Sequence, residues 1–201
     1  MDSFTFYSVP SDNISEMDSL IIPFGITSVG GLDNFHSLTS VTIPNSVTAL
    51  SGFVYCTSLA SITIPNSVTT LSGFGYCTSL ASITIPNSVT TIGNNTFNNC
   101  TGLTSVTISN SVTTIGDNSF SFCTSLVSVT IPNSVTTIGD GVLCDCTNLT
   151  AITILCETPP NVQSSSFGRT TPNCPIYVPA NSVDLYKSTW TSFADRIQAI
   201  P

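Results

Sequence analysis

Eight cysteines are the residues of this sequence with the clearest capacity for chemistry. Five of them recur at steps of 21, 23, 23 and 23 residues, at Cys56, Cys77, Cys100, Cys123 and Cys146. A four-cysteine zinc site gathers pairs such as C-x2-C around one point, whereas this spacing places the thiols along a line. We therefore interpret the five as small buried hydrophobic residues that face a core. From this pattern we predict no catalytic residue, no bound metal and no cofactor.

Three cysteines, Cys144, Cys156 and Cys174, lie outside this series. Cys156 and Cys174 bracket the segment ETPPNVQSSSFGRTTPN, and two alternatives stay open for them. A disulfide would close a loop that has no regular structure and would contribute about 3 kcal/mol by loop entropy. Otherwise both residues are free thiols.

Two further groups have ligand or acid–base chemistry. Asn94, Asp117 and Asp140 share one position after a glycine in successive copies of a repeat. Stacked carboxylates can bind Ca²⁺, but an aspartate after glycine more often bonds its own turn, which is the interpretation we favour. His36 is the single histidine, and we interpret it as an exposed loop residue. Because catalysis needs a nucleophile with a base, paired carboxylates or a metal, we predict a protein that is not an enzyme.

All these residues belong to one internal repeat. The isoleucine of the motif I-(P/S)-N-S-V recurs at steps of 21, 21, 23 and 23 residues, at Ile43, Ile64, Ile85, Ile108 and Ile131. Ile154 begins a final degenerate copy, and IIPFGITSV aligns with TIPNSVTAL one step later, so the first turn begins near residue 14. A period held this closely predicts a stacked repeat architecture.

Each copy contains two short extended segments. In L-x-S-V-T-I, as at residues 126–131, apolar and hydroxyl residues alternate, which predicts a strand with one buried side. In S-V-T-T-I, as at 134–138, Val135 and Ile138 mark the buried side. Pro-Asn-Ser between the segments predicts a turn, and Gly-x-x-x-Phe leads to the cysteine on a loop arm. Stacked copies predict a mostly-β solenoid of parallel sheets, with about seven turns of 21–23 residues.

The open ends of a solenoid must be covered. We therefore expect an N-terminal cap at residues 1–14, the repeats at 15–155 and a C-terminal capping region at 156–201. In the last region, PIYVP (175–179) predicts a strand, and Asn181 or Ser182 is predicted to cap a short helix. That helix carries Val183, Leu185 and Tyr186 and is followed by Trp190, Phe193 and Ile197.

The charge excludes two classes of partner. The chain has 201 residues, with 11 acidic and 3 basic residues and a net charge of -8. Nucleic acids and anionic membrane surfaces attract Lys and Arg, so we predict neither as a partner. No apolar run approaches the ~18 residues of a spanning helix, so we predict no membrane insertion. The N-terminal stretch MDSFTFYSVPSDNISEMDSL lacks the basic and apolar regions of a signal peptide.

The hydroxyl columns are the largest regular feature and supply the candidate binding residues. These residues are Ser61, Thr63, Ser82, Thr84, Ser105, Thr107, Ser128 and Thr130. Columns of serine and threonine can hydrogen-bond along a stack, where charged columns would repel. The columns are either the simplest soluble β-surface or a recognition face for a protein or glycan.

Two other uses of such a rod stay open. It could be structural, self-associating end to end into a filament or serving as a spacer or viral assembly component. Alternatively, its Ser-x-Thr rows could order water as an ice- or crystal-binding surface.

The motif L-T-S-(V/I)-T-I-P-N-S-V-T-x-I-G-x-x-x-F-x-x-C-x-x-L resembles the leucine-rich repeat of the BspA type over residues 15–155. The tail ILCETPPNVQSSSF…CPIYVPANSVDLYK…WTSFADRIQAI also resembles the C-terminal cap of such proteins in gut anaerobes. The resemblance implies a solenoid on a cell-surface or secreted protein, with a role in adhesion to matrix proteins, host cells or other bacteria. It carries no catalytic residues.

Overall fold

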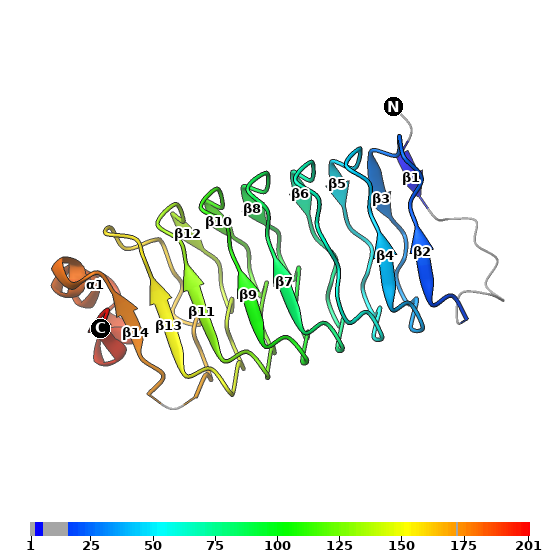
Figure 1. The fold of residues 1–201 in the computed structure, drawn as a ribbon. Helices are drawn as coiled ribbons and strands as arrows, with labels where there is room; N and C mark the ends of the chain where they lie inside the picture. The colour runs from blue at the N-terminus through cyan, green and yellow to red at the C-terminus, as the bar shows by residue number, and fades with distance from the viewer. Residues whose placement is uncertain (1–2, 6–15, 172) are drawn as a thin grey trace.

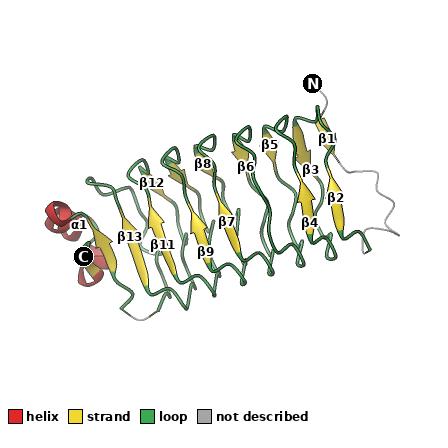
Figure 2. Cartoon of the chain, in the orientation of Figure 1, coloured by secondary structure: helices red, strands yellow, loops and turns green. Residues whose placement is uncertain are grey.

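A computed structural model describes residues 3–5, 16–171 and 173–201, which wind into an elongated rod with residues 3–5 near one end and the C-terminus at the other (Figure 1). Each turn of the chain adds one layer to the rod. Short strands line two sides and loops join them. Among the described residues, helices occur only at the C-terminal end (Figure 2). The predicted mostly-β solenoid of parallel sheets is confirmed.

The S-V-T-T-I segments, together with one N-terminal strand, build one continuous sheet of seven parallel strands. In spatial order these are β1 (Ser3–Thr5), β3 (Ser28–Gly30), β5 (Ala49–Leu50), β6 (Thr70–Leu71), β8 (Thr91–Ile92), β10 (Thr114–Ile115) and β12 (Thr137–Ile138). The register follows the repeat, because Thr114 pairs with Thr91 on one side and with Thr137 on the other. Each strand therefore meets its counterpart in the next turn.

The L-x-S-V-T-I segments, together with two strands of the C-terminal region, build the opposite side in three separate sheets. One pairs β2 (Ser19–Ile21) with β4 (Ser40–Thr42), and a second pairs β7 (Ser82–Thr84) with β9 (Ser105–Thr107). The third contains β11 (Ser128–Ile131), β13 (Ala151–Ile154), β14 (Ile176–Val178) and β15 (Ile197–Ala199). This side is thus interrupted, whereas the seven-stranded sheet is not.

The core runs along the axis of the rod as stacked columns of identical residue types. Phe53, Phe74, Phe97 and Phe120 form one column, with ring centroids 4.8, 5.6 and 5.4 Å apart. All four rings are buried, as are the repeated isoleucines from Ile64 onward. The glycine four residues before Phe120 lets the backbones of successive turns approach closely. A Cβ added at Gly116 would lie 2.7 Å from the backbone nitrogen of Asn94.

The N-terminal end continues the sheet. Strand β1 lies inside the expected cap at residues 1–14 and pairs in parallel with β3. The expected cap therefore contributes one strand of the main sheet, and its residues 1–2 and 6–14 lie outside the described part of the chain.

The C-terminal end is closed by a short helical segment. It consists of the 3-10 helix η1 (Ala180–Ser182), helix α1 (Val183–Thr189) and the 3-10 helix η2 (Thr191–Arg196). Tyr186, Trp190 and Phe193 are buried in it, and the Trp190 Nε1–H donates to Pro160 O at 3.0 Å. The predicted last strand and helical cap are confirmed.

Two details of this cap differ from the sequence-based expectation. Ser182 occupies the N-cap position, but its side chain makes no capping hydrogen bond. Its backbone has φ -108° and ψ -3°, which is helical, because the preceding 3-10 turn runs directly into α1. A capping side chain needs an extended backbone at that residue. The chain also ends in a strand, β15, which pairs with β14 and was not expected.

Candidate binding face

The eight predicted hydroxyl residues lie in line on one side of the rod. We call this set, from Ser61 to Thr130, the Ser/Thr face. Its members alternate with apolar residues that point inward, as in β11, where Ser128 and Thr130 are exposed while Val129 and Ile131 are buried. All eight side chains are exposed, so the alternation predicted from the sequence is confirmed.

The hydroxyl groups of the Ser/Thr face form no hydrogen bond with other described residues, which sets them apart from other threonines. In three of the four Thr-Thr pairs of the repeats, the first threonine donates its hydroxyl to a carbonyl one turn back. These bonds measure 3.2 Å each and join Thr69 to Thr48, Thr113 to Thr90 and Thr136 to Thr113. Hydrogen bonding along the stack therefore occurs in that column and not on the Ser/Thr face, whose two hydroxyls per turn remain available.

The Ser/Thr face is hollowed between two of its turns. A groove of about 350 Å³ lies between the turn of Ser61–Ile64 and the turn of β7. Four of the predicted residues line it, together with two isoleucines, one asparagine and one proline. They are Ser61, Thr63, Ser82 and Thr84, with Ile62, Ile64, Asn66 and Pro86.

The groove coincides with one of the two interruptions of this side, and the other interruption lies between β9 and β11. The segment 61–64 forms no strand, and within the described chain its backbone makes no hydrogen bond to either neighbouring turn. Strand β4 pairs only with β2, and β7 pairs only with β9. Exposed backbone N–H and C=O groups bond to water or to a partner, so this part of the face offers main-chain donors and acceptors as well as hydroxyls.

The five-cysteine column is buried, as predicted. Each thiol donates to the carbonyl of a residue one turn back, for example Cys100 Sγ to Phe74 O at 3.1 Å and Cys123 Sγ to Phe97 O at 3.3 Å. Burial is the main cause that raises the pKa of Cys56 and of Cys146 from 9.0 to about 12. Protonated, solvent-excluded thiols are poor nucleophiles, so the column serves the core.

The Asn94, Asp117 and Asp140 column has a role that differs from the expected one. Asn94 Oδ1 accepts from the Asp117 N–H at 2.9 Å, and Asp117 Oδ1 accepts from the Asp140 N–H at 2.8 Å. These side chains therefore bond the next turn and not their own, because the stacked backbones bring that N–H closest. Within the described residues, no three His, Cys, Asp or Glu side chains are grouped to hold a metal ion.

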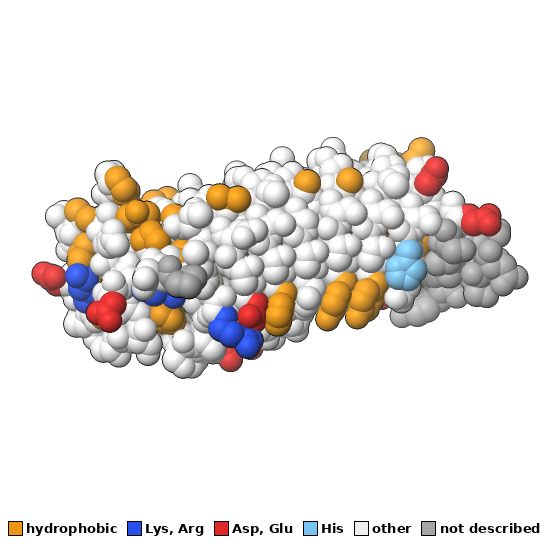
Figure 3. Space-filling view, turned by 90° about the horizontal axis from the view of Figure 1, so that it is seen from below, with side chains coloured by type: hydrophobic (Ala, Val, Ile, Leu, Met, Phe, Trp, Pro, Cys, Tyr) orange, Lys and Arg blue, Asp and Glu red, His pale blue; other side chains and the backbone are white. Residues whose placement is uncertain are grey.

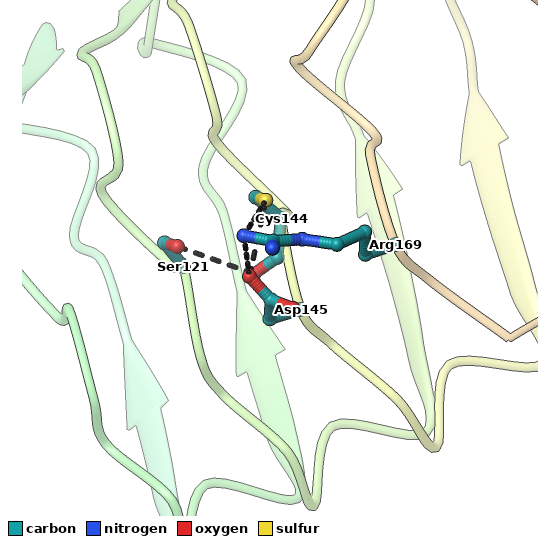
Figure 4. Close-up of polar contacts among 4 residues, drawn as sticks. All are labelled: Ser121, Cys144, Asp145 and Arg169. Carbon is teal, nitrogen blue, oxygen red and sulfur yellow. Dashed lines mark hydrogen bonds and ion pairs between the residues drawn. The ribbon is translucent and has the colours of Figure 1, made fainter.

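One polar cluster lies near the C-terminal end, on the loop side (Figure 4). Arg169 Nη2 lies 2.7 Å from Asp145 Oδ2 in an ion pair, and Cys144 Sγ lies 3.2 Å from the same oxygen. Ser121 Oγ donates to Cys144 O at 3.2 Å. Burial, followed by the bond to Asp145, raises the pKa of Cys144, although Arg169 opposes this. The thiol is thus kept protonated, and the cluster ties three turns together.

The structure does not bring the remaining candidate residues, Cys156, Cys174 and His36, together into a site. Cys156 and Cys174 are both free thiols, which settles the alternative between a bridge and two thiols. Cys156 Sγ bonds instead to Pro132 O at 3.2 Å. His36 is exposed, as expected. It follows Phe35, which occupies the cysteine position of its turn, five turns before Cys146.

Sequence reasoning missed one column, formed by the residue before each cysteine. Its members have a left-handed backbone with φ between 58° and 68°, and they are Asn34 (before Phe35, at the cysteine position of its turn), Tyr55, Tyr76, Asn99, Phe122 and Asp145. Each N–H donates to a carbonyl of the next turn, as in Tyr76 N to Asn98 O at 2.8 Å. Three members are exposed aromatic residues. The aromatic letters before Cys56, Cys77 and Cys123 were the available signal.

No helix of the described residues has the length and apolar character needed to cross a membrane. Helix α1, with seven residues, ends after two turns.

Solved structures with a similar fold come from bacteria. A leucine-rich repeat protein from Eubacterium ventriosum matches at 26% identity and a TM-score of 0.67, over 77% of this chain and 43% of that one. A leucine-rich repeat protein from T. pallidum matches at 25% identity and a TM-score of 0.64, over 92% of this chain and 87% of that one. The chain thus spans less than half of the first of these proteins. A search of curated proteins finds no match.

A family model described as the BspA type leucine rich repeat region matches in six copies, at residues 12–74 and 71–192. These ranges cover the stacked turns with their hydroxyl face and extend into the C-terminal cap. Repeat proteins of this family are generally not enzymes. The chain is a leucine-rich repeat solenoid and belongs to the BspA type leucine rich repeat family.

Proposed function

We propose that this chain is a non-enzymatic binding module that contacts a protein partner through its Ser/Thr face, in a cell-surface or secreted adhesion protein. The observation that carries the proposal is the groove between Ser61–Ile64 and β7. There, unbonded hydroxyls lie beside unpaired backbone groups. A protein partner can satisfy both kinds of group at once, because an extended segment supplies main-chain donors and acceptors at regular spacing.

The chemistry around the groove supports a protein more than a charged ligand. The S-x-T strands carry no charged side chain at their exposed positions from Ser61 to Thr130. Ile62 and Pro86 add apolar area beside the hydroxyls. A mixture of apolar contact and uncharged hydrogen bonding is typical of the centre of protein interfaces, from which charged residues are depleted.

The test is adhesion of beads coated with the chain to immobilised extracellular-matrix proteins and to epithelial cell layers. Thr84→Lys places a charge at the groove, and we expect retention to fall about tenfold or more, since burying an unpaired charge costs at least ~1.4 kcal/mol. The matched control is Thr91→Lys, which changes an exposed threonine of the same repeat on the seven-stranded sheet. We expect this control to be retained like the native chain.

Equal retention of both variants would show that the Ser/Thr face is not the contact surface. Absence of retention of the native chain on every surface would contradict the adhesive role itself. The two outcomes separate the site from the function.

The alternative of an ice- or crystal-binding face has less support. Such a face needs one flat and regular array, whereas this side is divided at the segment 61–64 and hollowed by the groove. The end-to-end filament also has less support. At the C-terminal end of the rod, the buried side chains of Trp190 and Phe193 cover the core, so this end is closed to a second copy.

A further inference from the structure

The column that precedes the cysteines carries a second surface, on the loop edge of the rod. Tyr55, Tyr76 and Phe122 are 41%, 36% and 40% exposed, and exposed hydrophobic side chains form a row along this edge (Figure 3). Asn99 occupies the same column between Tyr76 and Phe122. We call Tyr55, Tyr76, Asn99 and Phe122 the aromatic row.

The fold does not require aromatic residues in this row. All four residues have a left-handed backbone, with φ of 63°, 61°, 58° and 59°. Asparagine adopts this conformation several times more readily than a bulky residue, and it already occupies the column at Asn34 and Asn99. A bulky side chain held in this conformation points to a functional use.

The rings are arranged along the rod so that one face stays open. Tyr55 and Tyr76 stack on each other with centroids 4.4 Å apart and planes 21° apart. The other face of Tyr76 is therefore turned toward the turn of Asn99. Phe122 lies one turn further, so Tyr76 and Phe122 are two turns apart.

In the aromatic row, Asn99 lies between Tyr76 and Phe122, one turn from each. A strand spacing of about 4.8 Å places the backbones of Tyr76 and Phe122 roughly 10 Å apart. Asn99 Nδ2 donates to Asn98 Oδ1 at 2.6 Å. That bond leaves the Asn99 carbonyl oxygen and the Asn98 amino group for another partner, since an amide offers two donors and two acceptor positions.

We propose that the aromatic row binds a neutral oligosaccharide, with one sugar ring held between Tyr76 and Phe122. A gap of roughly 10 Å accepts one puckered ring with a carbon–carbon contact of about 4 Å on each side. The C–H groups of the sugar carry the positive character that an aromatic face attracts, and its hydroxyls pair with Asn98 and Asn99.

Charge selects among the possible ligands. The net charge of -8 opposes an acidic glycan or a nucleic acid. No basic residue lies before Arg169 to compensate. A proline-rich peptide also docks on aromatic residues, but it has few groups for the paired side-chain amides. A neutral polyhydroxylated ligand uses both the rings and the amides.

The test is calorimetric titration of the purified chain with cellohexaose, mannohexaose, hexagalacturonate and a decaproline peptide. We expect binding of at least one neutral hexasaccharide. The double variant Tyr76→Asn with Phe122→Asn should weaken that binding about tenfold or more. Because asparagine suits the left-handed backbone, the variant keeps its fold, which circular dichroism checks.

Two controls locate the site. Phe24→Asn removes an aromatic residue that is 86% exposed on another turn, and Thr84→Lys alters the Ser/Thr face; both should bind the sugar like the native chain. No binding of either neutral hexasaccharide at millimolar concentration would overturn the proposal. So would equal binding by the folded double variant, or preference for the peptide or the acidic sugar.

Discussion

Two aromatic columns run along this rod only two residues apart in each repeat, and they differ in every respect except spacing. The inner column, Phe53, Phe74, Phe97 and Phe120, is buried and keeps one residue type over four turns. The outer column mixes tyrosine, phenylalanine, asparagine and aspartate, and its members are exposed or half-buried. Repetition inside the rod therefore reflects packing, because each ring must fill the same volume. Outside, only the backbone conformation is shared.

The outer column also separates what the backbone requires from what the side chain adds. Every member from Asn34 to Asp145 donates its N–H to the next turn, whatever its side chain. The turn-to-turn hydrogen bond is thus the structural constant, and the aromatic rings are additions to it. Predictions that exchange or remove side chains in each column test this division.

The largest effect is expected inside. Phe97→Ala removes the ring between Phe74 and Phe120, and we expect the free energy of unfolding to fall by about 3–5 kcal/mol, from lost burial and the cavity left behind. Urea denaturation followed by circular dichroism measures it. Phe122→Ala is the control on the outer column. A loss below about 1 kcal/mol for Phe97→Ala would contradict the packing argument.

The next effect is loss of stability at alkaline pH. Burial raises the pKa of Cys56 and of Cys146 to about 12 in the folded chain, from 9.0. A thiol whose folded pKa is raised stabilises the fold fully below its unfolded pKa, and this contribution is lost as pH rises toward the folded value. For each thiol, the free energy of unfolding should then fall by about 1.4 kcal/mol per pH unit above ~9. At pH 10 the loss for the pair should be ~3 kcal/mol.

Urea denaturation at pH 8 and at pH 10 measures this loss. The double variant Cys56→Ala with Cys146→Ala is the control, and its free energy of unfolding should fall less steeply between the two pH values. An identical slope in both proteins would show that these thiols do not ionise on unfolding.

A smaller effect is expected at the loop column of Asp117. Asp117→Ala removes the acceptor of the Asp140 N–H, and we expect a loss of about 1–2 kcal/mol, as for one hydrogen bond to a charged group at an exposed site. Glu157→Ala is the control, because Glu157 is exposed and makes no hydrogen bond with other described residues. Thermal unfolding should separate the two variants, and equal midpoints would contradict the role of Asp117.

The repeat period predicted most of the architecture because period and hydrophobic alternation both act locally. The strands, the buried cysteines and the exposed hydroxyls of the Ser/Thr face follow from them directly. The groove does not follow from the period or from the alternation. ASITIPNSVTT occurs at residues 60–70 and again at 81–91, yet only the second copy forms a strand of the S-x-T side, β7. The difference must therefore come from neighbouring turns and not from the segment.

The outer column escaped prediction for the opposite reason. Tyrosine and phenylalanine favour extended backbone, so their letters before a cysteine gave no sign of a left-handed conformation at Tyr55, Tyr76 or Phe122. Stacking imposes that conformation through the hydrogen bond of each N–H to the next turn. Likewise, the bond from Asp117 to the following turn becomes visible only when the turns are superposed.

The smallest effect on stability is expected at Tyr76, where the outer column is tested most directly. Tyr76→Asn loses the stacking with Tyr55, worth about 0.5–1.5 kcal/mol. It also relieves a left-handed backbone that costs a bulky residue roughly 1–2 kcal/mol. These terms nearly cancel, so the free energy of unfolding should stay within about 1 kcal/mol of the native value. Thermal and urea unfolding check this. A loss approaching that of Phe97→Ala would mean that the outer rings are part of the packing, and the two columns would no longer differ in role.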